Sequence, residues 1–248
     1  MAGAKRTTLI TGAGKNIGRA CAHALSEEGF NVAINGSSDR AACERVAREC
    51  EKLGARALVV MGDVGKLEEC KRIFAEVTKG LGPIDALLNN AALRPSKPFL
   101  ETTEEEWQRV ISVDLEGAIR LSRLCLPGMV ERGWGRIVNF AGMNAIHGHA
   151  GRVHVSVAKH GVWGLTKSLA MEFGPKGITT NVISPGPIAP DAEEHNASVH
   201  ARAQALAKVP MGRMGKPAEV AAAARLLVSE AGGYINGQMI AVNGGGAT

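Results

Sequence analysis

Histidine side chains crowd one short stretch of this sequence. His147, His149, His154 and His160 all lie between residues 147 and 160. Histidine is the side chain that most readily gains or loses a proton near pH 7. One of the first three could therefore serve as a general acid, or all could be ordinary polar loop residues. His147, His149 and His154 could also hold a metal by ligand type. No thiolate or carboxylate stands nearby in the sequence, so we predict no metal site.

A serine and a lysine in the same stretch have the spacing of a known nucleophile pair. Ser156 and Lys159 spell S-x-x-K, which in other folds marks a serine nucleophile activated by a lysine. The other motifs that accompany this pair in such enzymes are missing from the sequence. We therefore interpret the match as accidental.

A glycine-rich segment near the start of the chain could bind phosphate groups. Residues 11–18 read T-G-A-G-K-N-I-G and follow a short apolar run that predicts a strand. Gly12 permits a tight turn, and Gly18 lets the following helix pack closely on the strand. The N–H groups and positive dipole end at the start of that helix favour a pyrophosphate. The strand–loop–helix context supports a prediction of dinucleotide binding.

Strand-like and helix-like patterns alternate along the whole chain around these residues. Near-continuous apolar strands between helices predict a parallel sheet covered on both faces, and right-handed crossovers give a doubly wound, Rossmann-like α/β fold. We expect a single domain over residues 1–248, with the polar segment 185–217 as a substrate flap or a plain surface excursion. We predict strands at 7–11, 31–35, 57–61, 84–88, 136–140, 178–183 and 238–242, and helices at 17–28, 40–53, 67–78, 103–130, 153–173 and 218–228.

The composition fits one soluble domain and disfavours several other classes. The chain has 248 residues, of which 45% are hydrophobic and 21% charged. No apolar run approaches the roughly 18 residues of a membrane span, and the chain enters a strand pattern without a leader-like segment. Five cysteines without metal spacing indicate a reduced, cytoplasmic chain. The net charge is +5, but scattered basic residues do not indicate nucleic-acid binding.

Motifs spread over nearly the whole chain resemble those of the short-chain dehydrogenase/reductase family. The loop at 11–18 is similar to the family's T-G-x-x-x-G-x-G, and N-N-A-A at 89–92 is similar to its N-N-A-G. Further matches follow in the family's order at 63–64, 135–139, 159–170, 181–186 and 237–245. The resemblance implies a nicotinamide dinucleotide held by Gly12, Lys15, Asn16, Ile17, Gly18, Ser37, Asp63, Val64, Asn90, Lys159, Pro185, Gly186 and Ile188.

One position of the phosphate loop departs from the family pattern. Asn16 stands where the family has its middle glycine. Asparagine is among the few other residues that tolerate a positive φ, so we expect the turn to survive.

The end of the second predicted strand bears on which nicotinamide is used. Family members that prefer NAD usually carry an acidic residue there, which binds the ribose hydroxyls and repels a 2′-phosphate. This chain has N-G-S-S at 35–38 and no carboxylate before Asp39. Lys15 and Arg40 could add positive charge, unless both are solvated surface residues. NADP(H) is therefore favoured over NAD(H).

The residues that transfer protons in the family are largely replaced. The family uses a Tyr four residues before a Lys, a Ser on a preceding loop, and an Asn on the fourth-unit helix. The resemblance places these at Val155, Lys159, Gly142 and Asp114, so only the lysine is kept. The single tyrosine, Tyr234, belongs to a C-terminal turn. Valine and glycine cannot transfer a proton, so the usual chemistry is excluded with the usual residues.

Five residues are candidates for the missing roles: Lys159, Asp114, His147, His149 and Asn144. Asp114 could form a simple ion pair with Lys159, or act as a general base whose pKa is set by burial. His147 and His149 stand on the loop that borders the substrate in the family. Asn144 could donate a hydrogen bond to a substrate carbonyl.

Three functions follow from these observations. The first is an NADP(H)-dependent oxidoreductase that acts on a small carbonyl or alcohol with a non-standard proton donor. The second is a non-redox lyase, isomerase or hydrolase that uses the same pocket, and the third is an inactive NADP(H)-binding sensor or partner subunit. The resemblance places the oxidoreductase first. It also implies a homodimer or homotetramer, without a nucleic-acid or membrane partner, built from helices 103–130 and 152–173 and the last strand.

Overall fold

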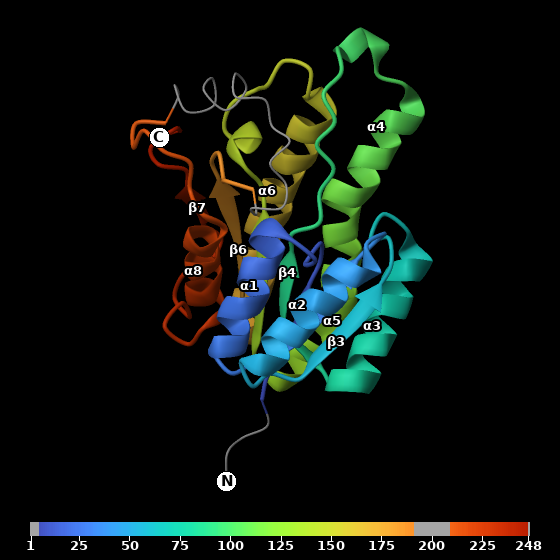
Figure 1. The fold of residues 1–248 in the computed structure, drawn as a ribbon, viewed down its shortest axis with the longest axis vertical. Helices are drawn as coiled ribbons and strands as arrows, with labels where there is room; N and C mark the ends of the chain where they lie inside the picture. Colours follow the sequence, from blue (N-terminus) through green and yellow to red (C-terminus); the bar gives the residue numbers. More distant parts are fainter. Residues whose placement is uncertain (1–4, 191–208, 248) are drawn as a thin grey trace.

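One parallel sheet with helices on both faces makes up the described part of the chain (Figure 1). The computed structural model describes residues 5–190 and 209–247. Its sheet has seven strands in the order β3-β2-β1-β4-β5-β6-β7, and every pair of neighbours is parallel. The predicted doubly wound, Rossmann-like fold class is therefore confirmed.

Each predicted strand and helix is present, with ends displaced by a few residues. The strands are β1 (Thr7–Ile10), β2 (Asn31–Gly36), β3 (Ala57–Met61), β4 (Ile84–Asn89), β5 (Gly135–Phe140), β6 (Ile178–Pro185) and β7 (Met239–Val242). The helices are α1 (Asn16–Glu27), α2 (Arg40–Lys52), α3 (Leu67–Leu81), α4 (Glu104–Ile111), α5 (Gly117–Arg132), α6 (Val153–Phe173) and α8 (Pro217–Val228). Among the described residues, no helix is both long enough and apolar enough to span a bilayer.

The stretch predicted as one helix over 103–130 has three parts. A π-helical turn, η2 (Ser112–Glu116), separates α4 from α5 and carries the buried Asp114. A single wider turn leaves the apolar spacing almost unchanged, so the sequence pattern does not reveal it. The start of α4 is fixed by a capping box between Thr103 and Glu106.

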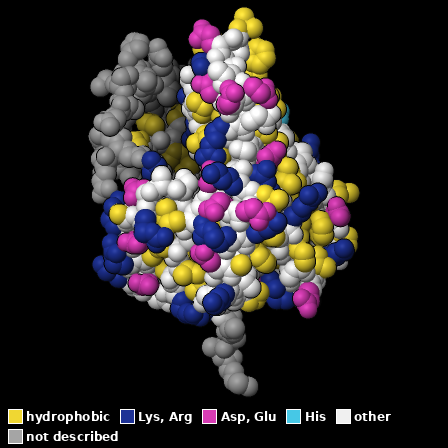
Figure 2. All heavy atoms as spheres, turned by 90° about the vertical axis from the view of Figure 1, so that its right-hand side faces the viewer, with side chains coloured by type: hydrophobic (Ala, Val, Ile, Leu, Met, Phe, Trp, Pro, Cys, Tyr) yellow, Lys and Arg dark blue, Asp and Glu magenta, His cyan; other side chains and the backbone are white. Residues whose placement is uncertain are grey.

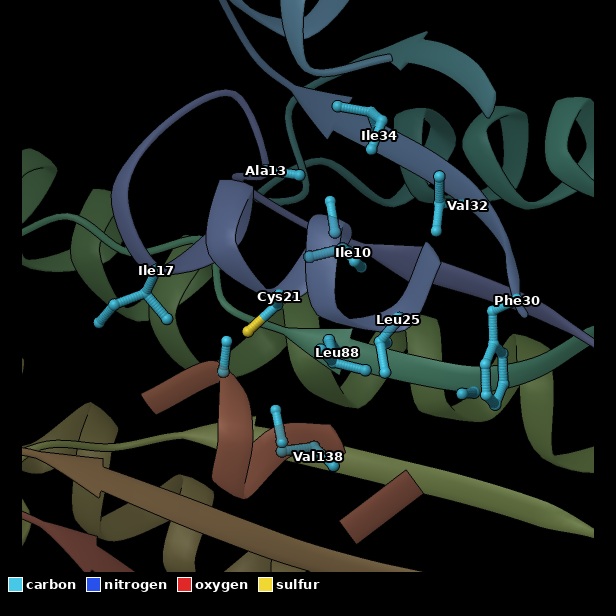
Figure 3. Close-up of a cluster of buried hydrophobic side chains, with 14 of the residues drawn as sticks. Ile10, Ala13, Ile17, Cys21, Leu25, Phe30, Val32, Ile34, Leu88 and Val138 are labelled. Carbon is cyan, nitrogen blue, oxygen red and sulfur yellow. The ribbon is translucent and has the colours of Figure 1, made fainter. Parts of the chain in front are cut away.

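A hydrophobic layer joins α1, α2 and α8 to one face of the sheet. Ile10 of β1, Leu25 of α1, Leu88 of β4 and Val138 of β5 are all buried in this layer. Figure 3 shows these side chains converging from the four elements. Their burial places the start of α1 over the carboxyl ends of β1 and β4, where the phosphate loop lies.

A second layer covers the opposite face of the sheet. Successive strand residues point to opposite faces, so Leu87 serves this layer while its neighbour Leu88 serves the other. Helices α3 and α5 supply its other side, through Ile73, Leu121 and Met129 among others. Helix α6 packs beside this layer on β5 and β6, which sets the position of Lys159.

The five cysteines are buried free thiols. Burial raises the pKa of Cys21 and of Cys125 to about 12, so both stay protonated near neutral pH. Protonated thiols are poor nucleophiles, and these residues serve as small apolar side chains in the core.

Charged side chains are mixed on the surface that Figure 2 shows. On this face, Lys and Arg alternate with Asp and Glu over α3 and α4. Several of them form pairs along one helix, such as Arg72 with Glu69 and Glu76. The mixture agrees with the scattered basic residues of the sequence.

Two leucines at opposite extremes of burial test the importance of the first layer. Leu88 is fully buried and Leu100 is 95% exposed. We expect Leu88→Ala to lower the free energy of unfolding by about 2–5 kcal/mol, because it leaves a cavity in β4. Leu100→Ala should change it by less than about 0.5 kcal/mol. Denaturant unfolding of the two variants measures both values, and equal losses would contradict this account of the core.

Candidate functional site

A cleft of about 700 Å³ opens where the strand order reverses between β1 and β4. Such switch points are where doubly wound sheets bind their ligands. Ten of the residues that the sequence predicts for cofactor binding line it: Gly12, Lys15, Asn16, Ile17, Gly18, Ser37, Asp63, Val64, Asn90 and Ile188. Lys159, Pro185 and Gly186 lie outside its lining. Residues 191–208 of the expected flap lie outside the described part of the chain.

The phosphate loop has room for backbone only. Gly12 has a φ of 61°, and a Cβ there would lie 3.0 Å from the Cα of Ala91. A Cβ on Gly18 would lie only 2.3 Å from the Gly12 carbonyl oxygen. These contacts explain why both positions are glycine and why the first turn of α1 faces the cleft so closely. Lys15, the N-cap residue of α1, has no side-chain oxygen to cap the first-turn N–H groups.

Asn16 adopts the conformation expected of it. Its φ is 49°, and it is the single non-glycine residue with a positive φ among the described residues. The prediction that asparagine takes the place of the family's middle glycine without breaking the turn is therefore confirmed.

Hydrogen bonds join the ends of β1 and β4 beneath the loop. The Oγ1 atom of Thr11 accepts from the backbone N–H groups of Asn90 and Ala91, each at 2.9 Å. The Nδ2 atom of Asn90 donates to the carbonyl oxygens of Thr11 and Gly12, at 2.9 and 3.0 Å. Asn90 thus holds the phosphate loop in place. The sequence predicted Asn90 as a cofactor residue but assigned no role to Thr11.

The end of β2 presents hydroxyl groups to the cleft. Ser37, Ser38 and Asp39 line it, but the Asp39 carboxylate also accepts from the N–H of Ala42 and caps α2. Arg40, expected to add positive charge, does not line the cleft and lies 3.8 Å from Glu44. Arg45, which was not predicted from the sequence, does line the cleft. It lies on the first turns of α2, where helical spacing could have found it.

Asp63 faces the cleft with its carboxylate already bonded. Its Oδ2 atom lies 2.8 Å from Arg109 Nη1, and its Oδ1 atom accepts from the N–H of Gly65. Arg109 also lines the cleft and comes from α4. The two residues are 46 positions apart, so no local sequence signal reveals the contact.

Lys159 and Asp114 meet inside the protein, beside the cleft. Their charged atoms lie 3.3 Å apart, and the two side chains are 4% and 0% exposed. The Lys159 ammonium also donates to the Phe140 carbonyl oxygen at 3.1 Å, and Asp114 accepts from the N–H of Leu93 at 2.7 Å. Burial lowers the pKa of Lys159, the Asp114 carboxylate raises it, and Arg94 lowers it further. The lysine is therefore closer to releasing its proton than an exposed lysine.

The histidines are not gathered at one point. His147 and His149 are exposed and do not line the cleft, while His160 contacts the Ser156 carbonyl oxygen of its own helix. His154 is buried and stacks on Trp107 of α4, with ring centroids 6.4 Å apart. Across the described residues, no three His, Cys, Asp or Glu side chains are placed to share a metal ion.

The residues that the sequence predicts at the family's serine and tyrosine positions, Gly142 and Val155, lie in the described part of the structure. Gly142 has a φ of 123°, which L side chains rarely adopt, so a serine there would be strained. Val155 is buried on α6, one turn before Lys159. Asn144 lies in a short 3₁₀ turn, η3 (Met143–Ala145), but its side chain is outside the described part of the structure.

A glycine cradle at the switch point of a doubly wound sheet is the arrangement shared by dinucleotide-binding domains. Residues 12–247 match a family described as enoyl-(acyl carrier protein) reductase. Nodulation protein G of Azospirillum brasilense is 38% identical over 242 residues, which cover 97% of this chain and 98% of that protein. Acetoacetyl-CoA reductase of Rhizobium meliloti has the same identity and coverage. A crystal structure of a putative gluconate dehydrogenase from Agrobacterium tumefaciens superposes with a TM-score of 0.91, at 34% identity over 97% of this chain and 95% of that one.

These matches, at such identity and coverage, are decisive for the family. The chain belongs to the short-chain dehydrogenase/reductase family of oxidoreductases.

Two glycines provide a matched test of the cradle. We expect Gly18→Ala to distort the loop and abolish NADPH binding, because its Cβ would collide with the Gly12 carbonyl. Gly164→Ala, in the middle of α6 with nothing within 4 Å of the added carbon, should leave binding intact. Nicotinamide fluorescence measures binding, and the melting temperature without cofactor reports the strain. Undiminished binding by Gly18→Ala would show that the cofactor does not use this loop.

Proposed function

We propose that this protein is an NADP(H)-dependent oxidoreductase that acts on a small carbonyl or alcohol. The observation that carries the proposal is the backbone cradle at Gly12 and Gly18, which opens onto a cleft of dinucleotide size beside a buried lysine. The names of the relatives, which include an acetoacetyl-CoA reductase, support carbonyl reduction. Gly12 and Gly18 carry no side chains, so the space next to the N–H groups at the start of α1 stays open. Such an open row of N–H groups suits a pyrophosphate.

The described residues fit a nicotinamide dinucleotide at specific positions. The first turn of α1 would receive the pyrophosphate, Ser37 would face the adenosine ribose, and Ile188 would line the nicotinamide end. When bound, the cofactor supplies or accepts a hydride at its nicotinamide ring. The protein's part is then to hold the substrate oxygen near a proton source and to keep water out.

The preference for NADP(H) rests on the charges at the end of β2. Ser37 and Ser38 offer hydroxyl groups there, and Lys15 and Arg45 also line the cleft. The Asp39 carboxylate caps α2, so the positive end of the helix dipole offsets part of the negative charge that a 2′-phosphate would meet. A phosphate next to lysine and arginine is favoured over a ribose hydroxyl there.

A carboxylate introduced at Ser37 tests this preference. We expect Ser37→Asp to weaken NADPH binding about tenfold or more and to change NADH binding much less, because only NADPH brings a second negative group there. Thr78→Asp, a hydroxyl-to-carboxylate change on the exposed surface of α3, is the control. Titrations that follow nicotinamide fluorescence give both dissociation constants. An equal loss for the two cofactors would rule out discrimination at Ser37.

We propose Lys159 as the proton donor, with Asp114 as its positioning residue. Lys159 is buried, its pKa is lowered by that burial, and its ammonium is held by Phe140 and Asp114. A donor with a lowered pKa transfers its proton more readily near neutral pH. His147 and His149 remain the alternative donors on the neighbouring loop.

The pH dependence of turnover separates these donors. Asp114→Asn keeps an oxygen for the Leu93 N–H but removes the charge that raises the pKa of Lys159. Activity requires the protonated lysine, so the alkaline limb of the pH profile of kcat should move to lower pH in Asp114→Asn. Lys159→Met should lose the activity altogether. Asp85→Asn, which breaks an ion pair with Arg132 elsewhere, is the control. Acetoacetyl-CoA and NADPH are the first substrates to use. A limb that moves only in the double variant His147→Ala, His149→Ala would assign the donor to the loop instead.

Cofactor binding and turnover measured together also bear on the other two functions. Tight NADPH binding with no hydride transfer to any carbonyl would favour the sensor or partner-subunit function. Gly142 and Val155 support the sensor or partner-subunit function, because neither side chain can transfer a proton at the positions predicted for the family's serine and tyrosine. Turnover without a change in nicotinamide absorbance would favour the non-redox enzyme.

We also propose a homodimer or homotetramer built from α5, α6 and β7. The outer face of α6 exposes Val157 and Met171, and β7 is the last strand of the sheet order. An uncovered sheet edge and exposed apolar side chains are relieved when copies of a chain associate.

A further inference from the structure

We infer that Arg94 and Arg152 form a subsite that binds an oxyanion group of the substrate, a carboxylate or a phosphate, at the mouth of the cleft. The inference rests on the proposed function, because it assigns this end of the cleft to the substrate. It adds a charge requirement that the proposed activity alone does not impose.

Arg94 stands at the end of the cleft, on the segment that follows β4. It lines the cleft together with Ala92 and Leu93. Within residues 5–190 and 209–247, no hydrogen bond or ion pair joins the Arg94 guanidinium to another side chain. Its neighbour Lys97 differs, because that ammonium contacts both carboxylate oxygens of Glu106.

Arg152 is brought to the same place by a contact between two loops. The backbone N–H of Lys97 donates to the Gly151 carbonyl oxygen at 2.8 Å. A Cβ on Gly151 would lie 3.1 Å from the Ser96 hydroxyl oxygen, so the two loops are tightly apposed. This contact sets Arg152, the next residue, against the segment that carries Arg94.

Arg152 contains a buried donor without a partner in the described structure. Its Nε atom is shielded from solvent and makes no hydrogen bond there. Ser156, one helical turn later, has a hydroxyl oxygen in the same condition. Residues four apart lie on one face of a helix, and Lys159 follows on that face at the next turn. The Arg152 Nε atom and the Ser156 hydroxyl, both without a hydrogen-bond partner in the described structure, therefore lie on the face of α6 that also carries Lys159.

The charges around these residues are unbalanced. Arg94 interacts electrostatically with both Lys159 and Arg152, and within the described part of the chain Asp114 is the carboxylate that opposes Arg94 and Lys159. The protein packed around Arg94 lowers its pKa, although part of its side chain stays exposed, and Arg152 lowers it further. Asp114 is already bonded to the Leu93 N–H and paired with Lys159. An anion would relieve the repulsion between the two guanidinium groups.

A guanidinium fork suits the chemistry of such a ligand. Its parallel N–H groups match the two oxygens of a carboxylate or phosphate and bind them with charge-assisted hydrogen bonds. A substrate anchored in this way would place its carbonyl carbon near Lys159 without any contact from Gly142 or Val155. The subsite thus favours substrates such as oxo acids over neutral ketones.

Binding measurements test the subsite without relying on turnover. The probes are malonate, inorganic phosphate and the neutral dimethyl malonate, each at millimolar concentration and constant ionic strength, with the melting temperature as readout. We expect malonate or phosphate to raise the melting temperature and dimethyl malonate to have no effect. Arg94→Gln or Arg152→Gln should raise the dissociation constant of the anion, read from this shift, about tenfold. Arg48→Gln, an exposed arginine on α2 outside the cleft, is the matched control. Whether malonate or phosphate binds more tightly identifies the kind of anion.

The unliganded variants distinguish a binding role from a structural one. No hydrogen bond or ion pair joins the Arg152 guanidinium to another group within residues 5–190 and 209–247, and Arg94 repels it. Arg152→Gln should therefore leave the melting temperature of the free protein unchanged or raise it. A large fall would mean that Arg152 supports the fold, and would overturn the subsite. Equal responses to malonate in the wild type, Arg94→Gln and Arg48→Gln would overturn it as well.

A kinetic comparison separates this inference from the proposed function. If the protein reduces acetoacetate with NADPH, Arg94→Gln should raise KM for acetoacetate about tenfold and leave KM for methyl acetoacetate unchanged. Absence of NADPH oxidation with both compounds would reject the proposed activity, while the malonate response would still decide the subsite. Equal increases of KM for the acid and the ester would reject the subsite alone.

Discussion

The close approach of α1 to the ends of β1 and β4 is the constraint on which the cleft depends. Gly12 and Gly18 leave no space for side chains, and Asn90 ties the loop down through the carbonyls of Thr11 and Gly12. The hydrophobic layer around Leu88 presses α1 onto the sheet above these contacts. The loop N–H groups and the α1 dipole therefore point at one place, where an anionic group gains the most.

The buried pair of Lys159 and Asp114 organises the other end of the site. A lone ammonium so deep in the protein would be strongly disfavoured, and the carboxylate offsets part of that cost. Asp114 can reach Lys159 because it sits in the π-helical turn between α4 and α5, held by the Leu93 N–H. Because Asp114 is engaged by Lys159 and the Leu93 N–H, no ion pair within the described residues neutralises Arg94 or Arg152, and the proposed anion subsite rests on this imbalance.

Much of the fold and of the cofactor side of the cleft could be predicted from the sequence. Runs such as 31–35 are strands because both of their faces are buried, and the spacing of Gly12 and Gly18 specifies a loop geometry that few other residues permit. The charged contacts around the cleft were predicted less well. The pairing of Asp63 with Arg109 and the outward position of Arg40 depend on how helices pack, which no local pattern encodes.

The sequence by itself determined the doubly wound sheet and the glycine-rich loop between β1 and α1, and it predicts Gly142 and Val155 at two of the family's proton-transfer positions. Periodicity and glycine spacing are local properties, so they can be read along the chain. Only the tertiary structure decided that the predicted pair of Lys159 and Asp114 is buried, that His154 stacks on Trp107 away from the other imidazoles, and that the loops carrying Arg94 and Arg152 meet. Contacts between residues far apart in sequence arise when loops and helices close on the sheet, and their charges and burial then set the chemistry.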